Sequence, residues 1–315
     1  MKTTPNTTRR WARLLANARQ PLLVLSAGVA LSAFAGCAKD KEQADVAPVD
    51  PVAQQFQGEV AFPGQTGPTM AGKLFGKDIT YQRINGRNVF GGDVLLPDSV
   101  VAPSAKGSAS PATESAGRDN HRWPFGEVFY SIDPAMPHKE RVTDAIAHWK
   151  SKTNIRFRLR STFNIFAPNY VYFFEGGGCY SEFIGKAGGK QKVSLGAECG
   201  TGNAIHEIGH VLGLYHEQSR QDRDNHIVVH YDHISTVPGI VQNFDKYDAA
   251  IGTDRGAFDF GSIMLYGSFS FSDSPVRAGR PTMTKKDGSL FEGQRAGLSV
   301  GDIKAVNAMY PVPVL

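Results

Sequence analysis

One segment near the middle of the chain constrains it most, because it combines three histidines, a glutamate and a glycine at fixed spacing. Residues 206–216 read His-Glu-Ile-Gly-His-Val-Leu-Gly-Leu-Tyr-His. His206 and His210 stand four residues apart, so on a helix both imidazoles project from the same face. Glycine accepts the left-handed conformation that ends a helix, so Gly213 predicts a turn that brings His216 back toward the other two.

Three nitrogen ligands with one position left open are typical of a catalytic zinc site. Glu207 is rotated off the histidine face, so it is better placed to hold a water at the open position and accept its proton. The segment therefore predicts one zinc ion bound by His206, His210 and His216, with Glu207 as general base. The alternative is an amphipathic helix with ordinary histidines, although the full spacing arises by chance in roughly a few of 100,000 such chains.

The residues that follow extend this pattern. H-E-x-x-H-x-x-G-x-x-H marks the metzincin metallopeptidases, and every fixed position is present from His206 to His216. Glu217, Arg220 and the Asp-Arg-Asp at 222–224 are similar to E-x-x-R-x-D-R-D, which follows the third histidine in the astacin family. The chain thus resembles an astacin, and the resemblance implies that the N-terminus made by propeptide removal pairs with Glu217.

A second element, Ser-Ile-Met-Leu-Tyr at 262–266, resembles the astacin Met-turn, S-I-M-H-Y. The resemblance implies that Met264 lies beneath the histidines as a hydrophobic floor. It also implies that Tyr266 is a displaceable zinc ligand that swings off to stabilise the tetrahedral intermediate. Leu265 replaces the family histidine, which is not a metal ligand. Taken alone, Met264 and Tyr266 would be ordinary core residues.

Three cysteines are present, and Cys37 lies in the targeting segment. The remaining two, Cys179 and Cys199, are an even number suited to one disulfide in an exported protein, and their surroundings match one of the two astacin bridges. Asn154 stands where the other family bridge would begin, so that bridge is expected to be lost. Two free thiols are the alternative.

Residues 1–36 have the features of an export signal, with a basic start and an apolar run at 22–31 too short to span a bilayer stably. Two forms of processing compete. Residues 33–35 offer a small-x-small site for ordinary secretion, whereas 34–37 resemble a bacterial lipobox, with phenylalanine in place of the usual leucine. We expect an outer-membrane lipoprotein modified at Cys37, or an extracellular protein after processing.

Residues 37–114 are predicted to be a tether and a latency propeptide. The part at 72–96 is too small to form its own core. Phe-Gly-Gly-Asp at 90–93 resembles the F-x-G-D motif of astacin propeptides, which implies that Asp93 occupies the open zinc position. Without the resemblance, this stretch would be a turn between strands. The activating protease is expected to cut within residues 112–117.

Residues 115–315 are long enough for a substantial core and are predicted to form the catalytic domain. A strand is expected at 122–124, continuing through 128–130, and a buried strand is expected at 171–174. Apolar residues at helical spacing predict a helix between them: Val142, Ala145, Ile146 and Trp149.

Ser299 and Asp302 are expected to cap a final helix that ends near Tyr310. By resemblance to the family, Lys-Val-Ser-Leu at 192–195 is expected to be the edge strand that pairs with an extended substrate. The expected fold class is α/β, in the α+β sense of the metzincin fold. This resemblance implies a twisted mixed sheet and helices above the active-site cleft, with an irregular C-terminal lobe after Gly213 below it.

His226, His230 and His233 raise the possibility of a second metal site. However, the β-branched run at 227–229 predicts a strand, which favours surface histidines. The net charge of +4 is spread along the chain and gives no reason to expect a nucleic-acid partner.

Gly-Gln-Arg at 293–295 resembles a stretch that several astacin-like enzymes carry near the pocket just after the scissile bond. Arginine offers a planar charged fork suited to a carboxylate, so Arg295 is expected to bind Asp or Glu at that position of the substrate. The alternative is that Arg295 pairs with a neighbouring acid such as Glu292.

Together these features predict a zinc endopeptidase that hydrolyses proteins or peptides. It would be made as a latent exported precursor, inhibited by Asp93 and activated by proteolysis. The alternative function is a catalytically silent, zinc-containing binding or adhesion lipoprotein. Intact Glu207 and Tyr266 argue against it, because a binding module has no use for a general base.

Overall fold

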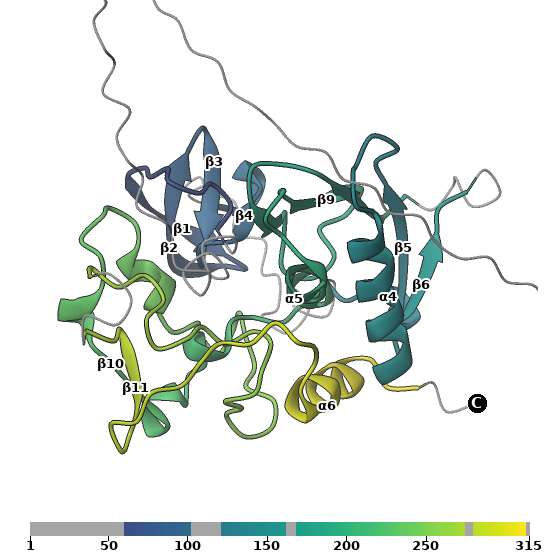
Figure 1. Ribbon diagram of the computed structural model, residues 1–315. Coiled ribbons are helices and arrows are strands. Elements are labelled where there is room, and N and C mark those ends of the chain that lie inside the picture. The colour runs from purple at the N-terminus through teal and green to yellow at the C-terminus, as the bar shows by residue number, and fades with distance from the viewer. Residues whose placement is uncertain (1–59, 102–120, 162–167, 275–279, 313–315) are drawn as a thin grey trace, which may run out of the picture. The chain divides into compact units, whose positions relative to one another are not determined.

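The computed structural model describes residues 60–101, 121–161, 168–274 and 280–312 (Figure 1). The export signal, Cys37, the tether and the activation cut were predicted at positions outside these described residues.

Strands dominate the N-terminal half of the described chain, and short helical turns dominate the C-terminal half. The strands are β1 (Thr69–Leu74), β2 (Lys77–Ile84), β3 (Arg87–Phe90), β4 (Val94–Leu96), β5 (Glu127–Ile132), β6 (Arg156–Leu159), β7 (Tyr170–Phe174), β8 (Cys179–Ser181), β9 (Lys190–Leu195), β10 (Ile227–Val229) and β11 (Met283–Lys285). The α-helices are α2 (Asp98–Val101), α4 (Glu140–Lys152), α5 (Thr201–Leu212) and α6 (Val300–Met309). The 3-10 helices are η1 (Pro124–Gly126), η3 (Glu217–Ser219), η4 (Arg223–Asn225), η5 (Tyr231–His233) and η6 (Val241–Phe244). No helix in the described ranges is long and apolar enough to cross a membrane.

Nine of the described strands form one mixed sheet in the order β1-β2-β3-β4-β8-β9-β7-β5-β6. Strands β9, β7, β5 and β6 run parallel to one another, and β8 is antiparallel to β9. Strands β1 to β4 form an antiparallel meander that joins β8 through one parallel pair, Val94 with Ser181. Figure 1 shows this meander in purple to blue beside the teal parallel strands. The expected α/β class with a twisted mixed sheet is confirmed.

Helices α4 and α5 pack together on the parallel part of the sheet and share its main core. All four residues that predicted α4 are buried, and Trp149 donates a hydrogen bond from Nε1 to Ile205 O of α5 at 3.1 Å. Helix α6 begins at Ser299, whose hydroxyl accepts a bond from Asp302 N, so the predicted cap is confirmed. Cys179 of β8 is bonded to Cys199, just before α5, which confirms the predicted disulfide.

The described residues of the meander do not form a hydrophobic core of their own. Leu74, Ile79 and Val94 pack in one cluster with Phe183 and Ile184 from the segment after β8. A segment this short cannot bury enough apolar surface within itself, which is why it packs against the residues that follow β8.

Two predictions about strands were wrong. Residues 192–195 belong to β9, which is hydrogen bonded to β7 on one side and β8 on the other, so β9 is not an edge. The strand that faces the meander is β8, which is only three residues long and follows three glycines. Such a short strand gives little periodicity to detect.

The strand predicted to begin at 122–124 begins instead at Glu127. Pro124 lacks a backbone N–H and has a fixed φ, which suits the first position of a helical turn. The residues Pro124–Gly126 accordingly form η1, and the chain becomes extended only after it.

Candidate metal centre and active site

Helix α5 carries two of the three histidines and fixes their separation. Its start is capped by Asn203, whose Oδ1 accepts the Gly200 N–H at 2.9 Å. It ends at Gly213, where φ is 104°, the left-handed conformation that glycine favours. The chain then reverses and brings His216 to the other two rings. The ring centroid of His210 lies 4.8 Å from that of His206 and 4.8 Å from that of His216.

Hydrogen bonds fix the direction of two rings. His206 Nδ1 lies 2.8 Å from Ile263 O, and His210 Nδ1 lies 2.8 Å from Leu214 O. A carbonyl only accepts, so each Nδ1 carries the proton and each Nε2 presents a lone pair to the centre of the cluster. Burial, followed by the nearby charge of Arg295, lowers the pKa of His206 to about 3, so this ring is neutral, the form that binds a metal.

Met264 packs directly beneath this helix. A Cβ added at Gly209 would lie 2.7 Å from Met264 Sδ, so only glycine permits the approach. Asp302 holds the start of the same turn, because its carboxylate accepts bonds from Ser262 Oγ at 2.7 Å and Ile263 N at 3.0 Å. The sequence identified Asp302 only as a helix cap.

Asp93 completes the cluster from the N-terminal meander and is fully buried. Its Oδ2 lies 3.0 Å from His216 Nε2 and 3.2 Å from His206 Nε2, and its Oδ1 lies 3.4 Å from His210 Nε2. One ligand atom from each of the four residues lies within 4.8 Å of the others.

This donor set fits a zinc ion. At least two Nε2 lone pairs and a carboxylate face one another, and His210 Nε2 lies 3.4 Å from Asp93 Oδ1 without a well-formed hydrogen bond to any described residue. Buried acceptors facing each other are unfavourable unless a cation lies between them. Three imidazole nitrogens with one oxygen are a tetrahedral set that Zn²⁺ accepts.

Two glycines let Asp93 approach so closely. Gly91 and Gly92 have φ of 61° and 93°, and a Cβ at Gly91 would touch the His216 ring at 3.4 Å. Ser181 N of β8 donates to Asp93 O at 3.0 Å, which ties the segment to the sheet. The structure therefore brings the F-x-G-D stretch onto the histidines.

Tyr266 lies at this centre, and Glu207 directly follows His206 on α5. Tyr266 Oη donates to Gly91 O at 2.6 Å, and its ring centroid lies 4.6 Å from that of His216. Glu207 is fully buried on α5. Gln218, a residue the sequence did not single out, is also fully buried, and its Oε1 accepts a bond from Tyr266 N at 3.3 Å. It occupies an unspecified position of the family signature, so the motif carried no signal for it.

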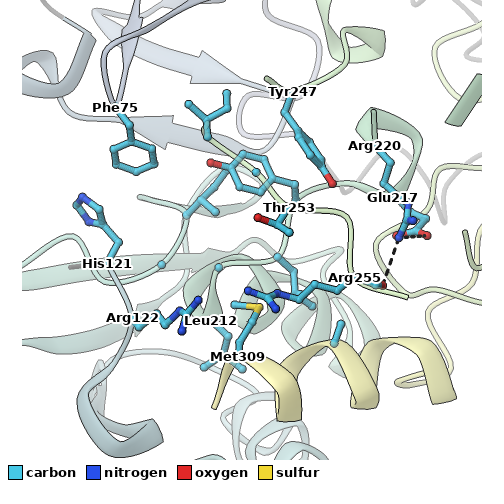
Figure 2. A pocket seen from close by; sticks show the side chains of 18 residues that line it. Phe75, His121, Arg122, Leu212, Glu217, Arg220, Tyr247, Thr253, Arg255 and Met309 are labelled. Carbon is cyan, nitrogen blue, oxygen red and sulfur yellow. Dashed lines mark hydrogen bonds and ion pairs between the residues drawn. The ribbon is translucent and has the colours of Figure 1, made fainter. Parts of the chain in front are cut away.

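Glu217 borders a cavity of about 110 Å³ (Figure 2). Its Oε1 accepts a bond from Asp259 N at 2.8 Å and lies 3.5 Å from Arg220 Nη1. Burial raises the pKa of Glu217 to about 7, although Arg220 favours the charged form. Figure 2 shows Phe75 of the meander facing His121 across the mouth of this cavity, with ring centroids 4.6 Å apart.

Arg295 lies against the Met-turn. Its Nη1 donates to Gln294 O at 2.6 Å and to Leu265 O at 3.5 Å. A Cβ added at Gly202 of α5 would lie 2.7 Å from Arg295 Cβ, so Arg295 packs four residues before His206 on this helix, and its charge helps to lower the pKa of His206 and His216.

Among the described residues, His226, His230 and His233 do not form a three-ligand group. The rings of His230 and His233 stack with centroids 5.3 Å apart, but their nitrogens contact Thr284 Oγ1 and the Pro281 carbonyl, and His226 stacks on Phe258. In the part of the chain that the structure describes, the one group of His, Cys, Asp and Glu able to hold a metal is the cluster around Asp93.

Residues 115–311 match the family model described as Astacin, peptidase family M12A. The chain belongs to this family. It is 37% identical to blastula protease 10 of Paracentrotus lividus over 235 residues, which are 70% of this chain and 38% of that protein. It is 34% identical to astacin-like metalloprotease toxin 1 of Loxosceles intermedia over 242 residues, 73% of this chain and 83% of the toxin.

Among solved structures, the chain is similar to high choriolytic enzyme 1, a hatching enzyme zinc-protease from Oryzias latipes. The identity is 31% and the TM-score is 0.52, over 60% of this chain and 92% of that one. The chain spans only 33% to 38% of the length of several curated relatives, including zinc metalloproteinase nas-15 of Caenorhabditis elegans. The matched region is a zinc metallopeptidase domain, and its cofactor is zinc.

Proposed function

We propose that this astacin is an exported zinc endopeptidase that acts on proteins or peptides and is made as a latent precursor. The observation that carries the proposal is Asp93, which is buried among His206, His210 and His216 of a zinc-peptidase domain. A silent binding lipoprotein would need neither a buried carboxylate at Glu207 nor a segment that covers its metal centre.

Each side chain then has a defined task. Zinc, when bound by the three histidines, supplies a Lewis acid that lowers the pKa of water and polarises a carbonyl. Glu207 accepts the proton of the attacking water and delivers it to the leaving nitrogen as the peptide C–N bond breaks. Tyr266 Oη, once released from Gly91 O, donates to the oxyanion that forms on the substrate carbonyl.

Latency follows from the same contacts. The carboxylate of Asp93 would take the ligand position that the three histidines leave open on zinc, and Gly91 O accepts the hydrogen bond of the Tyr266 hydroxyl. Strand β4 pairs with β8, so the backbone groups that an extended substrate would use are taken. Removal of the meander would free the zinc ligand position, the Tyr266 hydroxyl and the backbone groups of β8 together. We therefore propose a propeptide within residues 37–114 and a catalytic domain at 115–315.

Activation would require another protease to cut within residues 112–117. The described chain resumes at His121, which lines the cavity of Glu217 together with Arg122. A new N-terminus a few residues upstream would therefore start near this cavity, and its ammonium group is a suitable partner for the buried Glu217 carboxylate.

Chelation is the direct test of this function. We expect the processed protein to cleave denatured protein, to lose that activity with a zinc chelator, and to regain it when stoichiometric zinc is returned. The readout is release of fluorescent peptides from a labelled substrate. A processed protein that holds one zinc ion yet cleaves nothing would favour the binding module instead.

The N-terminal segment predicts where the enzyme acts. If Cys37 carries lipid, Ala38 favours the outer over the inner membrane, because it is not an aspartate. The activating cut would then release the catalytic domain. We expect mass spectrometry to find lipid on the membrane-bound precursor and no lipid on the soluble active form. An active form that still carries lipid contradicts release, and a precursor that begins at another residue identifies ordinary secretion.

Arg295 is proposed to select the residue just after the scissile bond. A planar guanidinium can bind a carboxylate with two hydrogen bonds, typically worth about 1.5–3 kcal/mol, or roughly 10- to 100-fold in selectivity. We expect a peptide library to show a preference for Asp or Glu at this one position, and Arg295→Ala to erase it. Arg156→Ala, which changes an exposed arginine on β6, is the matched control. A wild-type profile without acidic preference would make Arg295 structural.

A further inference from the structure

A surface of four apolar side chains lies beside the histidine cluster on the catalytic domain. We call it the apolar wall, and it comprises Ile184, Tyr215, Tyr247 and Ile251. The two tyrosine rings lie 5.0 Å apart, and Tyr247 Oη donates to Asp254 Oδ1 at 2.5 Å. The wall is therefore held in place from within the catalytic domain.

The N-terminal meander covers this wall. Ile79, Phe90 and Val94 face it across a cavity of about 500 Å³, and the same residues share its apolar cluster. With the meander in place, Ile184, Tyr247 and Ile251 are at most 7% exposed. If proteolysis removes the meander, an apolar surface next to the reacting centre is opened to solvent, and such surfaces are typical of ligand sites.

The position of the wall indicates which half of a substrate it meets. The cavity is lined by His210 and His216, whereas Arg295 packs against Gly202, four residues before His206 on α5, and donates from Nη1 to Leu265 O. The wall therefore lies toward His210 and His216, and Arg295 lies toward His206. If Arg295 receives the residue after the scissile bond, the wall receives residues before it.

We propose that the apolar wall is a specificity subsite for an apolar side chain within the three residues before the scissile bond. The proposal rests on the peptidase function above and extends it. In the precursor, Phe90 and Val94 occupy the subsite that substrate side chains take after activation.

Matched peptides test the proposal on the protein after the activating cut. A library profile first identifies the position of strongest apolar preference. Two peptides that differ only by leucine or glycine at that position are then compared. We expect kcat/KM to be about tenfold or more higher for the leucine peptide, the scale of one buried aliphatic side chain. Ile251→Asp should bring this ratio close to one.

Leu159→Asp is the matched control, because it places the same carboxylate at an apolar residue on β6 that is 59% exposed. It should leave the leucine-to-glycine ratio unchanged. If the wild-type enzyme cleaves both peptides equally at every position before the cut, the subsite is wrong although the peptidase function stands. If Ile251→Asp is cleavage-competent and keeps the full ratio, the wall is not the subsite. If Ile251→Asp does not fold, the proposal is tested by the wild-type leucine-to-glycine ratio and by the same ratio measured for Tyr247→Ala, which should be lower. A wild-type protein that cleaves no peptide refutes the function itself.

Discussion

Replacing Glu207 with glutamine is expected to lower kcat of the processed enzyme by about 10²- to 10⁴-fold, the usual contribution of a general base. Glutamine has nearly the same shape as glutamate but cannot accept the proton of the attacking water. Glu207 is fully buried beside His206, so an isosteric change should preserve packing. Zinc content, measured by atomic emission, and the thermal unfolding midpoint are expected to stay close to the wild-type values.

Glu198→Gln is the matched control for this variant. It makes the same chemical change at an exposed residue shortly before α5, and we expect wild-type cleavage. Retention of more than a few per cent of activity by Glu207→Gln, with zinc bound, would show that another group accepts the proton.

Asp93→Ala is expected to make the uncut precursor active. The carboxylate of Asp93 lies within 3.4 Å of all three His Nε2 atoms and is fully buried. Truncating one partner of a buried charged contact costs about 2–5 kcal/mol, so the open form of the precursor should become at least roughly 30-fold more populated. Cleavage by the intact, full-length chain is the readout, with its length verified by mass spectrometry.

Asp78→Ala is the control for loss of a carboxylate in the same meander. Its side chain is 88% exposed and pairs with Lys73 at the surface, where such pairs contribute little. This variant should stay latent. A precursor carrying Asp93→Ala that binds zinc and remains as inactive as the wild type would refute inhibition by the carboxylate.

Local chemistry was predictable where a residue's role depends on its immediate neighbours in sequence. The helix carrying His206 and His210 ends at Gly213 as expected, and Ser299 caps α6 as expected. The reason is that caps and helical spacing act over three or four residues. The Cys179–Cys199 bridge followed from resemblance to a family pattern.

The strand order was harder to predict, because it depends on hydrogen bonds between distant segments. Residues 192–195 have the alternation of a strand, but that alternation is the same for an edge strand and an inner one. Only the pairing of β9 with both β7 and β8 shows that it is internal. Likewise, nothing local to β8 reveals that Ser181 pairs with Val94 of the meander.

Short runs of neighbouring residues encode the histidine spacing, the helix that displays it and the family signature. The F-x-G-D resemblance implied that Asp93 meets the histidines, and the fold brings it among them; that Gln218 contacts Tyr266 and that Ile184 and Ile251 form one wall could be seen only in the folded protein. These contacts join residues as much as 123 positions apart, and the free energy that selects them comes from burial in a shared core rather than from local propensity.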